Sequence, residues 1–402
     1  MSHTSRSSSL AILGAPPAFA EALHVGRPNL GSREALLRRI NGLLDRNWLT
    51  NNGPLVQEFE QRVAERLDVA HCVATCNGTV ALEIAIRALG LSGEVIVPSF
   101  TFVATAHALK WQEITPVFCD IDPRTHTIDP EDVERRIGPR TAGIIGVHLW
   151  GRPCDVARLE ALASRRGLTL LFDASHAFGC THAGRLVGGC GAAEVFSFHA
   201  TKFINSAEGG AITTSDGRLA ERLRLMRNFG FAGYDNVVSI GSNGKMSELS
   251  AAMGLTSLES FEEFVDVNFR NHESYTRALA GLPGLALLPD ERGERRNYQY
   301  VVVEVDPEAC PLTRDELLAV LHADNVLARR YFYPGCHRME PYGSLDPESG
   351  RGLPVTEAVC RRVLVLPTGT SIGDEQIATV GEIVRAALAK AEEIRRVLSS
   401  ER

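Results

Sequence analysis

Short apolar runs alternate with helical patterns through the first 250 residues, and this alternation constrains the fold more than any other feature of the sequence. Helical patterns such as Thr79–Leu89 and Phe102–Leu109 separate most of the runs. This spacing is typical of a mostly parallel sheet with helices on both faces. Seven strands are predicted, at His71–Cys76, Val95–Pro98, Pro116–Cys119, Ala142–Leu149, Leu168–Phe172, Val195–Phe198 and Gly210–Thr214.

The pattern changes after about residue 250. A long helix is predicted at Leu249–Glu263, followed by a Gly/Pro-rich stretch at Gly281–Gly293. Because 402 residues exceed what one hydrophobic core usually organises, we expect two domains. We predict a disordered leader over residues 1–20, a large domain over 21–265 and a small α+β domain over 266–402. The small domain has strands at Tyr298–Val305 and near Val326–Tyr331, and helices at Thr313–Asp324 and from Asp374.

Charge and cysteine content exclude several classes of function. The net charge is −7, and no Lys/Arg-rich run is present, which argues against a nucleic-acid partner. No apolar run approaches the roughly 18 residues needed to span a bilayer. The nine cysteines form no CxxC pair, which predicts reduced thiols and a cytoplasmic protein. Histidines and cysteines also lack the paired spacing of a zinc site, so we expect no metal.

Lys202 is the first candidate for chemistry. The segment Ser197-Phe198-His199-Ala200-Thr201-Lys202 leaves a predicted buried strand, and Glu208-Gly209-Gly210 opens the next one. Burial disfavours the ammonium form of a lysine, and the neutral amine is the form that condenses with an aldehyde to give a Schiff base. A solvated loop lysine is the alternative for this segment taken alone.

Two further segments suggest a cofactor for that lysine. Asp173 follows the strand Leu170-Leu171-Phe172, at the edge where open α/β sheets collect ligands. Its carboxylate could keep a pyridinium nitrogen protonated, as pyridoxal phosphate chemistry requires, or could cap the next helix. The turn at Thr75–Val80 precedes a helix whose first amides, with the Thr79 hydroxyl, could bind phosphate. Thr79 could also be an ordinary N-cap, and the two roles are compatible.

In chain order, these segments resemble the DegT/DnrJ/EryC1/StrS family of sugar aminotransferases, which have the aspartate-aminotransferase-like, type I pyridoxal phosphate fold. The resemblance covers about residues 24–385. It rests on the stretches Trp48–Pro54, Val97–Thr105, Asp173–His176, Ser197–Lys202 and Asn243–Glu248.

The resemblance implies a role for each matching residue. Lys202 would form the Schiff base and Asp173 would pair with the pyridine nitrogen. Phe102 would stack on the cofactor ring, and His176 would lie near its phenolic oxygen. The phosphate would be held by Gly78, Thr79, Ser197 and, from the partner subunit of a homodimer, Asn243.

The stretch from Asn325 to His337 is similar to the subgroup that acts on nucleotide-linked 4-keto-6-deoxyhexoses. Its substrate candidates are Arg329, Arg330, Tyr331 and His337. The arginines, together with Arg338, could pair with a diphosphate or could simply form a solvated basic strand edge. The chain also departs from the family at two positions. Ala207 replaces a common glycine, which puts a left-handed backbone there in doubt, and Phe172 replaces a common acidic residue.

We therefore predict a pyridoxal-phosphate-dependent transaminase. An amino donor, L-glutamate, would convert the cofactor to its pyridoxamine form, which would then aminate a keto-sugar nucleotide. Lys202 would carry the proton as general base and acid. One alternative substrate is a cyclitol or a cyclic keto acid, and another possibility is a noncatalytic fold homologue. A sugar dehydratase of this family would carry His in place of Lys202, so that alternative is disfavoured.

Overall fold

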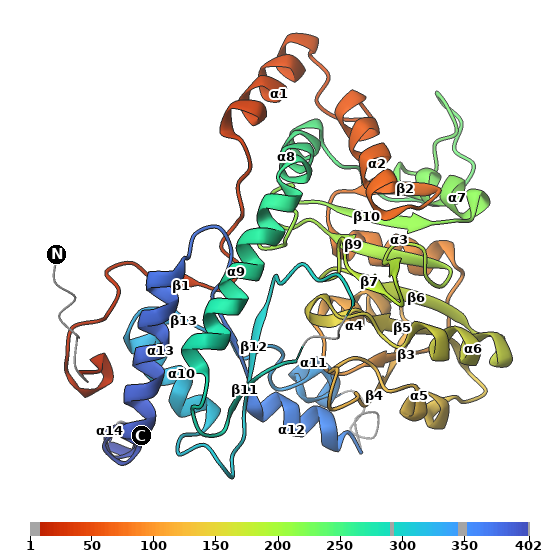
Figure 1. Ribbon diagram of the computed structural model, residues 1–402. Helices are drawn as coiled ribbons and strands as arrows, with labels where there is room; N and C mark the ends of the chain where they lie inside the picture. The colour runs from red at the N-terminus through yellow and green to blue at the C-terminus, as the bar shows by residue number, and fades with distance from the viewer. Residues whose placement is uncertain (1–8, 290–292, 345–351, 401–402) are drawn as a thin grey trace.

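The computed structural model describes residues 9–289, 293–344 and 352–400, and its main feature is a seven-stranded sheet (Figure 1). The strand order is β2-β10-β9-β6-β5-β3-β4. Strand β10 is antiparallel to β2 and β9, and the other neighbouring pairs are parallel. The strands are β2 (His71–Thr75), β3 (Glu94–Pro98), β4 (Thr115–Cys119), β5 (Thr141–Val147), β6 (Thr169–Asp173), β9 (Ala193–Ser197) and β10 (Gly210–Thr214). All seven predicted strands and the predicted fold class are confirmed.

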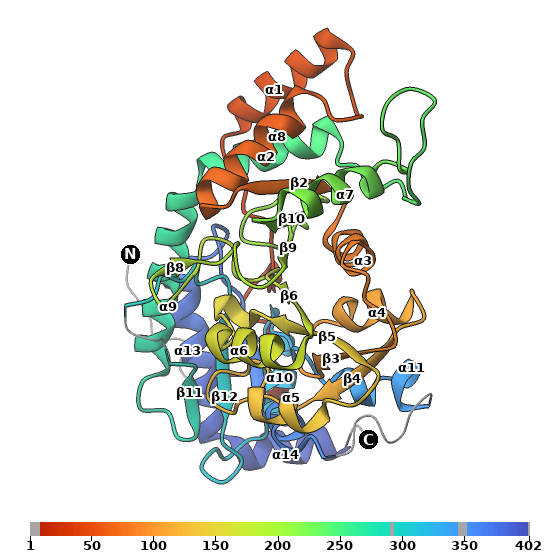
Figure 2. The ribbon, with the colours of Figure 1, turned by 90° about the vertical axis from the view of Figure 1, so that its right-hand side faces the viewer.

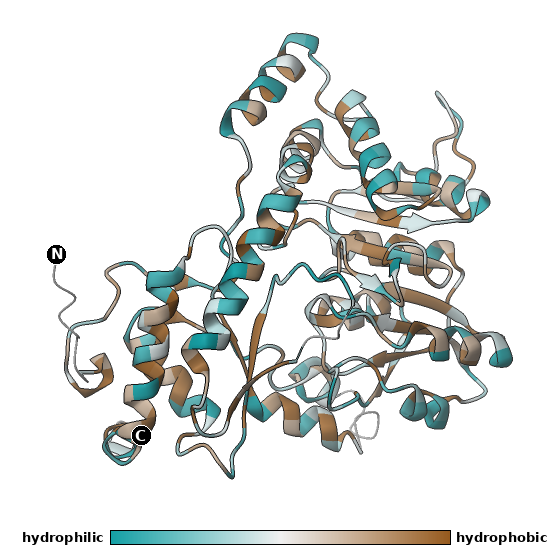
Figure 3. Ribbon diagram, in the orientation of Figure 1, coloured by the Kyte–Doolittle hydropathy of each residue, from teal (hydrophilic) through white to brown (hydrophobic). Residues whose placement is uncertain are grey.

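Helices cover both faces of this sheet (Figure 2). Helices α3 (Gly78–Ala88), α4 (Ala104–Lys110) and α7 (Gly217–Arg227) pack on one face. The other face is covered by α2 (Pro54–Leu67), α5 (Pro130–Arg136), α6 (Val156–Arg166) and α8 (Glu248–Glu259). Apolar residues at helical spacing, such as Phe59, Val63 and Leu67 in α2, are buried against the strands. Figure 3 shows the resulting hydrophilic and hydrophobic faces of the outer helices.

The C-terminal part of the chain has a hydrophobic core of its own. It contains an antiparallel sheet of β11 (Leu285–Leu287), β12 (Val301–Val305) and β14 (Val363–Leu366). Around it lie helices α9 (Phe261–Leu279), α10 (Arg314–Ala323), α13 (Asp374–Ala389) and α14 (Ala391–Ser400). The predicted helix Leu249–Glu263 is interrupted at Ser260, between α8 and α9. Because α9 begins at Phe261, the predicted domain boundary at residue 265 lies inside this helix.

The N-terminal segment corrects one expectation. We predicted a disordered leader over residues 1–20, but residues 9–20 pack against the C-terminal core, and Leu10 is buried there. The buried carboxylate of Asp324 accepts a hydrogen bond from the Ala18 N–H at 3.0 Å, and Asn325 donates to the Phe19 carbonyl at 2.8 Å. Apolar residues on either side of the turn at Gly14 make this packing possible. Residues 1–8 lie outside the described residues.

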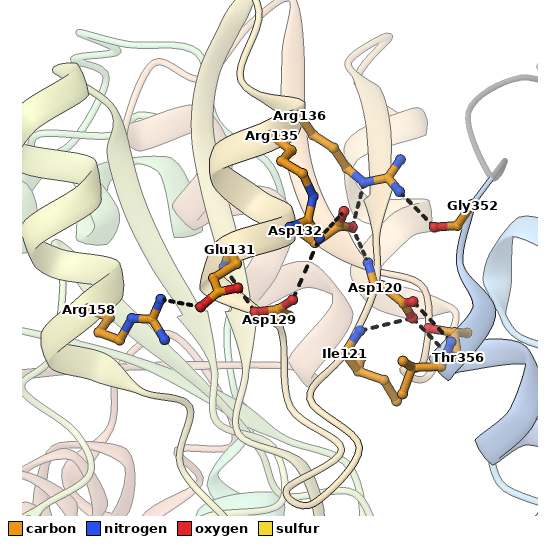
Figure 4. Close-up of polar contacts among 11 residues, drawn as sticks. Asp120, Ile121, Asp129, Glu131, Asp132, Arg135, Arg136, Arg158, Gly352 and Thr356 are labelled. Atoms are coloured by element: carbon orange, nitrogen blue, oxygen red, sulfur yellow. Dashed lines mark hydrogen bonds and ion pairs between the residues drawn. The ribbon is translucent and has the colours of Figure 1, made fainter.

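A polar network joins the two parts of the molecule (Figure 4). Asp120 follows β4, and its carboxylate accepts hydrogen bonds from the N–H groups of Val355 at 3.0 Å and Thr356 at 2.7 Å. Both donors belong to the first turn of helix α12 (Pro354–Arg362). The Asp120 N–H donates to Asp132, which also pairs with Arg136 at 2.6 Å. Asp120 thus caps a helix of the C-terminal part and fixes it on the main sheet.

Two further observations bear on the sequence predictions. All nine cysteines lie within the described residues and are free thiols. Among the helices that the described residues form, none is long and apolar enough to cross a membrane.

Candidate active site

The site lies at the carboxyl ends of strands β6 and β9, where Asp173 ends one strand and Ser197 ends the next. Lys202 follows β9 in a loop, and the N-terminus of α3 faces it across a cavity of about 550 Å³. A cavity of this size matches that of an ordinary small-molecule site. The predicted residues that line it together are Gly78, Thr79, Phe102, Asp173, His176, Ser197, Lys202 and Tyr331.

Asp173 is held in place by two hydroxyl groups that the sequence did not single out. Thr105 in α4 donates its hydroxyl to Oδ2 at 2.9 Å. Ser175 donates its hydroxyl and its N–H to Oδ1, at 2.6 Å and 3.1 Å. Both residues lie inside stretches that carried the family resemblance, yet neither had been given a role. Three hydrogen bonds fix the orientation of the carboxylate, which lines the cavity.

The turn before α3 forms a cradle for an anion. The Asn77 side chain, and not that of Thr79, caps the helix by accepting the Val80 N–H at 2.8 Å, so Thr79 lies inside the first turn. The first amides of a helix have no partner within it. At Gly78 an added Cβ would lie 2.8 Å from the Ser197 Cβ, so only glycine lets the turn approach Ser197 this closely. The arrangement suits a phosphate group.

Two titratable groups in the cavity have shifted pKa values. Burial lowers the pKa of Lys202 to about 8, although the negative charge of Asp173 opposes this shift. Burial, together with the positive charge of Lys202, lowers the pKa of His176 well below its usual value. His176 is therefore a neutral imidazole at pH 7, and a fraction of Lys202 is present as the neutral amine near that pH.

The remaining predicted site residues lie outside the cavity. Asn243 is exposed in the loop between α7 and α8, where its backbone pairs with Asn228. Arg329 places its guanidinium 5.0 Å from the Tyr331 ring centre, and Arg330 contacts Asp315 at 3.1 Å. His337 is buried and bonds to the Ser99 hydroxyl at 2.6 Å. Of the four substrate candidates, Tyr331 is the one that lines the cavity among the described residues.

Ala207 corrects a second expectation. We doubted a left-handed backbone here because the usual glycine is missing, but Ala207 has φ +62°. Its N–H donates to Asn205 Oδ1, and its carbonyl accepts the Ala200 N–H at 2.8 Å. These bonds hold the turn that carries Lys202, so alanine adopts a conformation it rarely takes.

Comparison with known proteins identifies the family of the chain. Residues 32–385 match the model of the DegT/DnrJ/EryC1/StrS aminotransferase family. The chain belongs to this family. It is thus a pyridoxal-phosphate-dependent transaminase, and the predicted family, enzyme class and cofactor are confirmed.

Individual relatives extend over nearly the whole chain. The dTDP-4-amino-4,6-dideoxy-D-glucose transaminase of Escherichia coli is 34% identical over 90% of this chain and 98% of its own length. The crystal structure of DesI, determined in the presence of its TDP-sugar product, is 49% identical, with a TM-score of 0.92 over 97% of this chain and 98% of that one. The crystal structure of 3-amino-5-hydroxybenzoic acid synthase is 26% identical to this chain. Its TM-score is 0.83, and the match covers 92% of this chain and 100% of that one.

The residues present fit pyridoxal phosphate. The Gly78 cradle suits its phosphate, and the Asp173 carboxylate suits a protonated ring nitrogen. The side chain of Phe102 is 56% exposed and lines the cavity, so it offers an apolar ring face. His176 Nδ1 is buried without a hydrogen-bond partner in the described part of the chain, so it is a polar atom whose hydrogen bond a bound group would supply.

Proposed function

We propose that the protein transfers the amino group of L-glutamate to the keto carbon of a nucleotide-linked 4-keto-6-deoxyhexose, with dTDP as the nucleotide. The observation that carries this proposal is the 49% identity to DesI, which extends over almost the full chain. The structure of DesI was determined in the presence of its TDP-sugar product. The E. coli relative also has a dTDP-linked aminodideoxyhexose in its name.

The chain's own residues divide the chemistry among them. Bound pyridoxal phosphate supplies an aldehyde and a ring that takes up negative charge during amino transfer. Asp173, fixed by Thr105 and Ser175, holds a proton at the ring nitrogen. Lys202 would be the nucleophile toward that aldehyde, and its amine would move a proton to or from the substrate carbon. With its pKa lowered to about 8, Lys202 can both accept and donate that proton near neutral pH.

A substrate panel tests the proposed substrate. The purified enzyme would be incubated with glutamate and, separately, with dTDP-, GDP- and UDP-linked 4-keto-6-deoxyhexoses and a keto-cyclitol. Mass spectrometry and NMR would identify any aminated product. We expect the dTDP-sugar to give the highest kcat/KM. A preference for the cyclitol would contradict the substrate and leave the transaminase assignment intact.

We also propose a cytoplasmic homodimer with active sites shared across the interface. The loop between α7 and α8, which projects at the upper right of Figure 1, exposes Phe229, Phe231, Tyr234, Val237, Val238 and Ile240. Helix α1 (Arg33–Arg46) exposes Leu37 and Leu44. Apolar surface on this scale supports a protein interface. Asn243 lies near the end of the same loop and is exposed.

Mixed dimers test whether sites are shared. Lys202→Ala and Asn243→Ala subunits would be co-expressed, and heterodimers would carry one site with both residues intact. If Asn243 acts across the interface, the mixture recovers about a quarter of wild-type activity, because half of the dimers are mixed and each has one intact site. Recovery no greater than the sum of the separate variants would contradict shared sites.

A further inference from the structure

His176 is surrounded by aromatic side chains from distant parts of the chain. The Tyr300 ring lies 4.5 Å from its ring centre, and Trp150 and Phe332 each lie 6.1 Å away in nearly parallel planes. The side chain of His176 is 6% exposed. These contacts fix the plane of the imidazole, so its two nitrogen atoms have defined surroundings.

The two nitrogens differ in their partners. Nε2 lies 3.1 Å from the Tyr300 hydroxyl oxygen, whereas Nδ1 is buried and has no partner among the described residues. His176, Tyr300 and Lys202 line the same cavity. A neutral imidazole has one N–H donor and one acceptor, and the hydrogen bond at one nitrogen decides the state of the other.

We infer that Tyr300 is a positioning residue, which donates its hydroxyl to His176 Nε2 and thereby fixes the proton on Nδ1, so that Nδ1 is a hydrogen-bond donor. Within the described part of the chain, the Tyr300 hydroxyl has His176 Nε2 as its hydrogen-bond acceptor. The opposite tautomer would leave that hydrogen without an acceptor in a partly buried site and would give Nδ1 a bare lone pair. Burial raises the pKa of Tyr300, so its hydroxyl keeps its proton and stays a donor at neutral pH.

This role of Tyr300 deepens the proposed function and rests on it in one respect. A donor at Nδ1 affects the reaction because it would stabilise negative charge on the phenolic oxygen of the cofactor. The apoenzyme, however, has its tautomer whether or not that oxygen is present. The tautomer and the cofactor can therefore be tested separately.

The first measurement is 15N NMR of the histidine-labelled apoenzyme at neutral pH. The chain has 12 histidines, and the His176→Gln variant assigns the signal of interest. We expect wild-type His176 to be protonated at Nδ1. In Tyr300→Phe it should revert to the Nε2-protonated form that free neutral imidazole prefers. Wild-type protonation at Nε2, or an unchanged signal in Tyr300→Phe, would overturn the inference.

Tyr342→Phe is the matched control. It also removes a hydrogen bond between tyrosine and histidine, since the Tyr342 hydroxyl lies 2.7 Å from His107 Nδ1. That pair does not line the active-site cavity. The control should alter the His107 signal and leave that of His176 unchanged. A change at His176 in both variants would indicate a general structural effect and contradict the specific role of Tyr300.

The second measurement is the pH titration of the absorbance of the holoenzyme. Loss of the Nδ1 donor would destabilise the anionic phenolic oxygen of the cofactor. The midpoint pH of the absorbance titration should therefore rise by about half to one pH unit in Tyr300→Phe. An unchanged midpoint would overturn the inference. If the wild type develops no cofactor absorbance, the proposed function fails. The NMR measurement on the apoenzyme still tests whether Tyr300 fixes the tautomer of His176.

Discussion

Asp120 and Asp173 occupy similar places in the sheet but do different work. Each follows an apolar strand at the carboxyl edge of the sheet, after β4 and at the end of β6, and each is 6% exposed. The oxygens of Asp120 accept N–H groups of Ile121, Val355 and Thr356, and so they cap α12. Those of Asp173 accept from Thr105 and Ser175, and the carboxylate also lines the cavity. What faces the strand end, and not the strand itself, decides whether a carboxylate is structural or chemical.

Replacing Asp173 with Asn should have the largest effect on activity. The amide keeps the shape of the side chain but cannot hold a proton on the ring nitrogen. We expect kcat/KM to fall by about 10³-fold, while the free energy of unfolding changes by less than about 1 kcal/mol. Steady-state kinetics and urea unfolding would measure the two effects. A stability loss with preserved turnover would assign Asp173 to the structural class instead.

Asp120→Asn is the counterpart and should show the reverse pattern. Its amide group would face backbone donors at the start of α12, so one hydrogen bond is lost and the charge at the helix N-terminus disappears. We expect a loss of about 2 kcal/mol in the free energy of unfolding. The kcat of folded enzyme should stay within about threefold of wild type. A collapse of kcat without destabilisation would break the comparison.

Thr105→Val sharpens the comparison on the chemical side. Removing one donor to the Asp173 carboxylate should lower kcat by about tenfold, the value of one hydrogen bond to a charged group. In the Asp173→Asn background the same change should cost much less, because its effect acts through the charge of Asp173. A double-mutant cycle measures this coupling, and additive effects would show that Thr105 acts independently.

The pH dependence of cofactor binding should show the smallest effect. The neutral amine of Lys202 attacks the aldehyde, and its pKa is lowered to about 8. The rate at which apoenzyme gains the cofactor absorbance should therefore rise about fivefold from pH 7 to pH 8 and level off above pH 9. Stopped-flow absorbance would follow it. A rate that keeps rising tenfold per pH unit to pH 10 would mean that Lys202 has an ordinary pKa.

The sheet could be predicted from the sequence because its strands are apolar, short and separated by turn or helix signals. The roles within the site could not. Val117-Phe118-Cys119-Asp120 and Leu170-Leu171-Phe172-Asp173 have the same pattern, and only the tertiary fold brings α12 to one and the cavity to the other. Strand β11 was missed because its three residues lie in a Gly/Pro-rich stretch.

The family resemblance supplied what periodicity could not. By its pattern alone Phe102 would have been assigned to the core, yet its side chain is 56% exposed and lines the cavity. Tyr300 had no signal in the sequence, because its partner His176 lies 124 positions away in the chain. Contacts of this kind follow from the packing of the C-terminal part against the sheet.

The most direct test of the account is to find where the cofactor is attached. The holoenzyme would be reduced with borohydride, which converts a Schiff base to a stable amine, and then digested and mapped by mass spectrometry. We predict a phosphopyridoxyl group on Lys202 and none in Lys202→Ala. Attachment to another lysine, or no attachment in a protein that still catalyses amino transfer, would contradict the account.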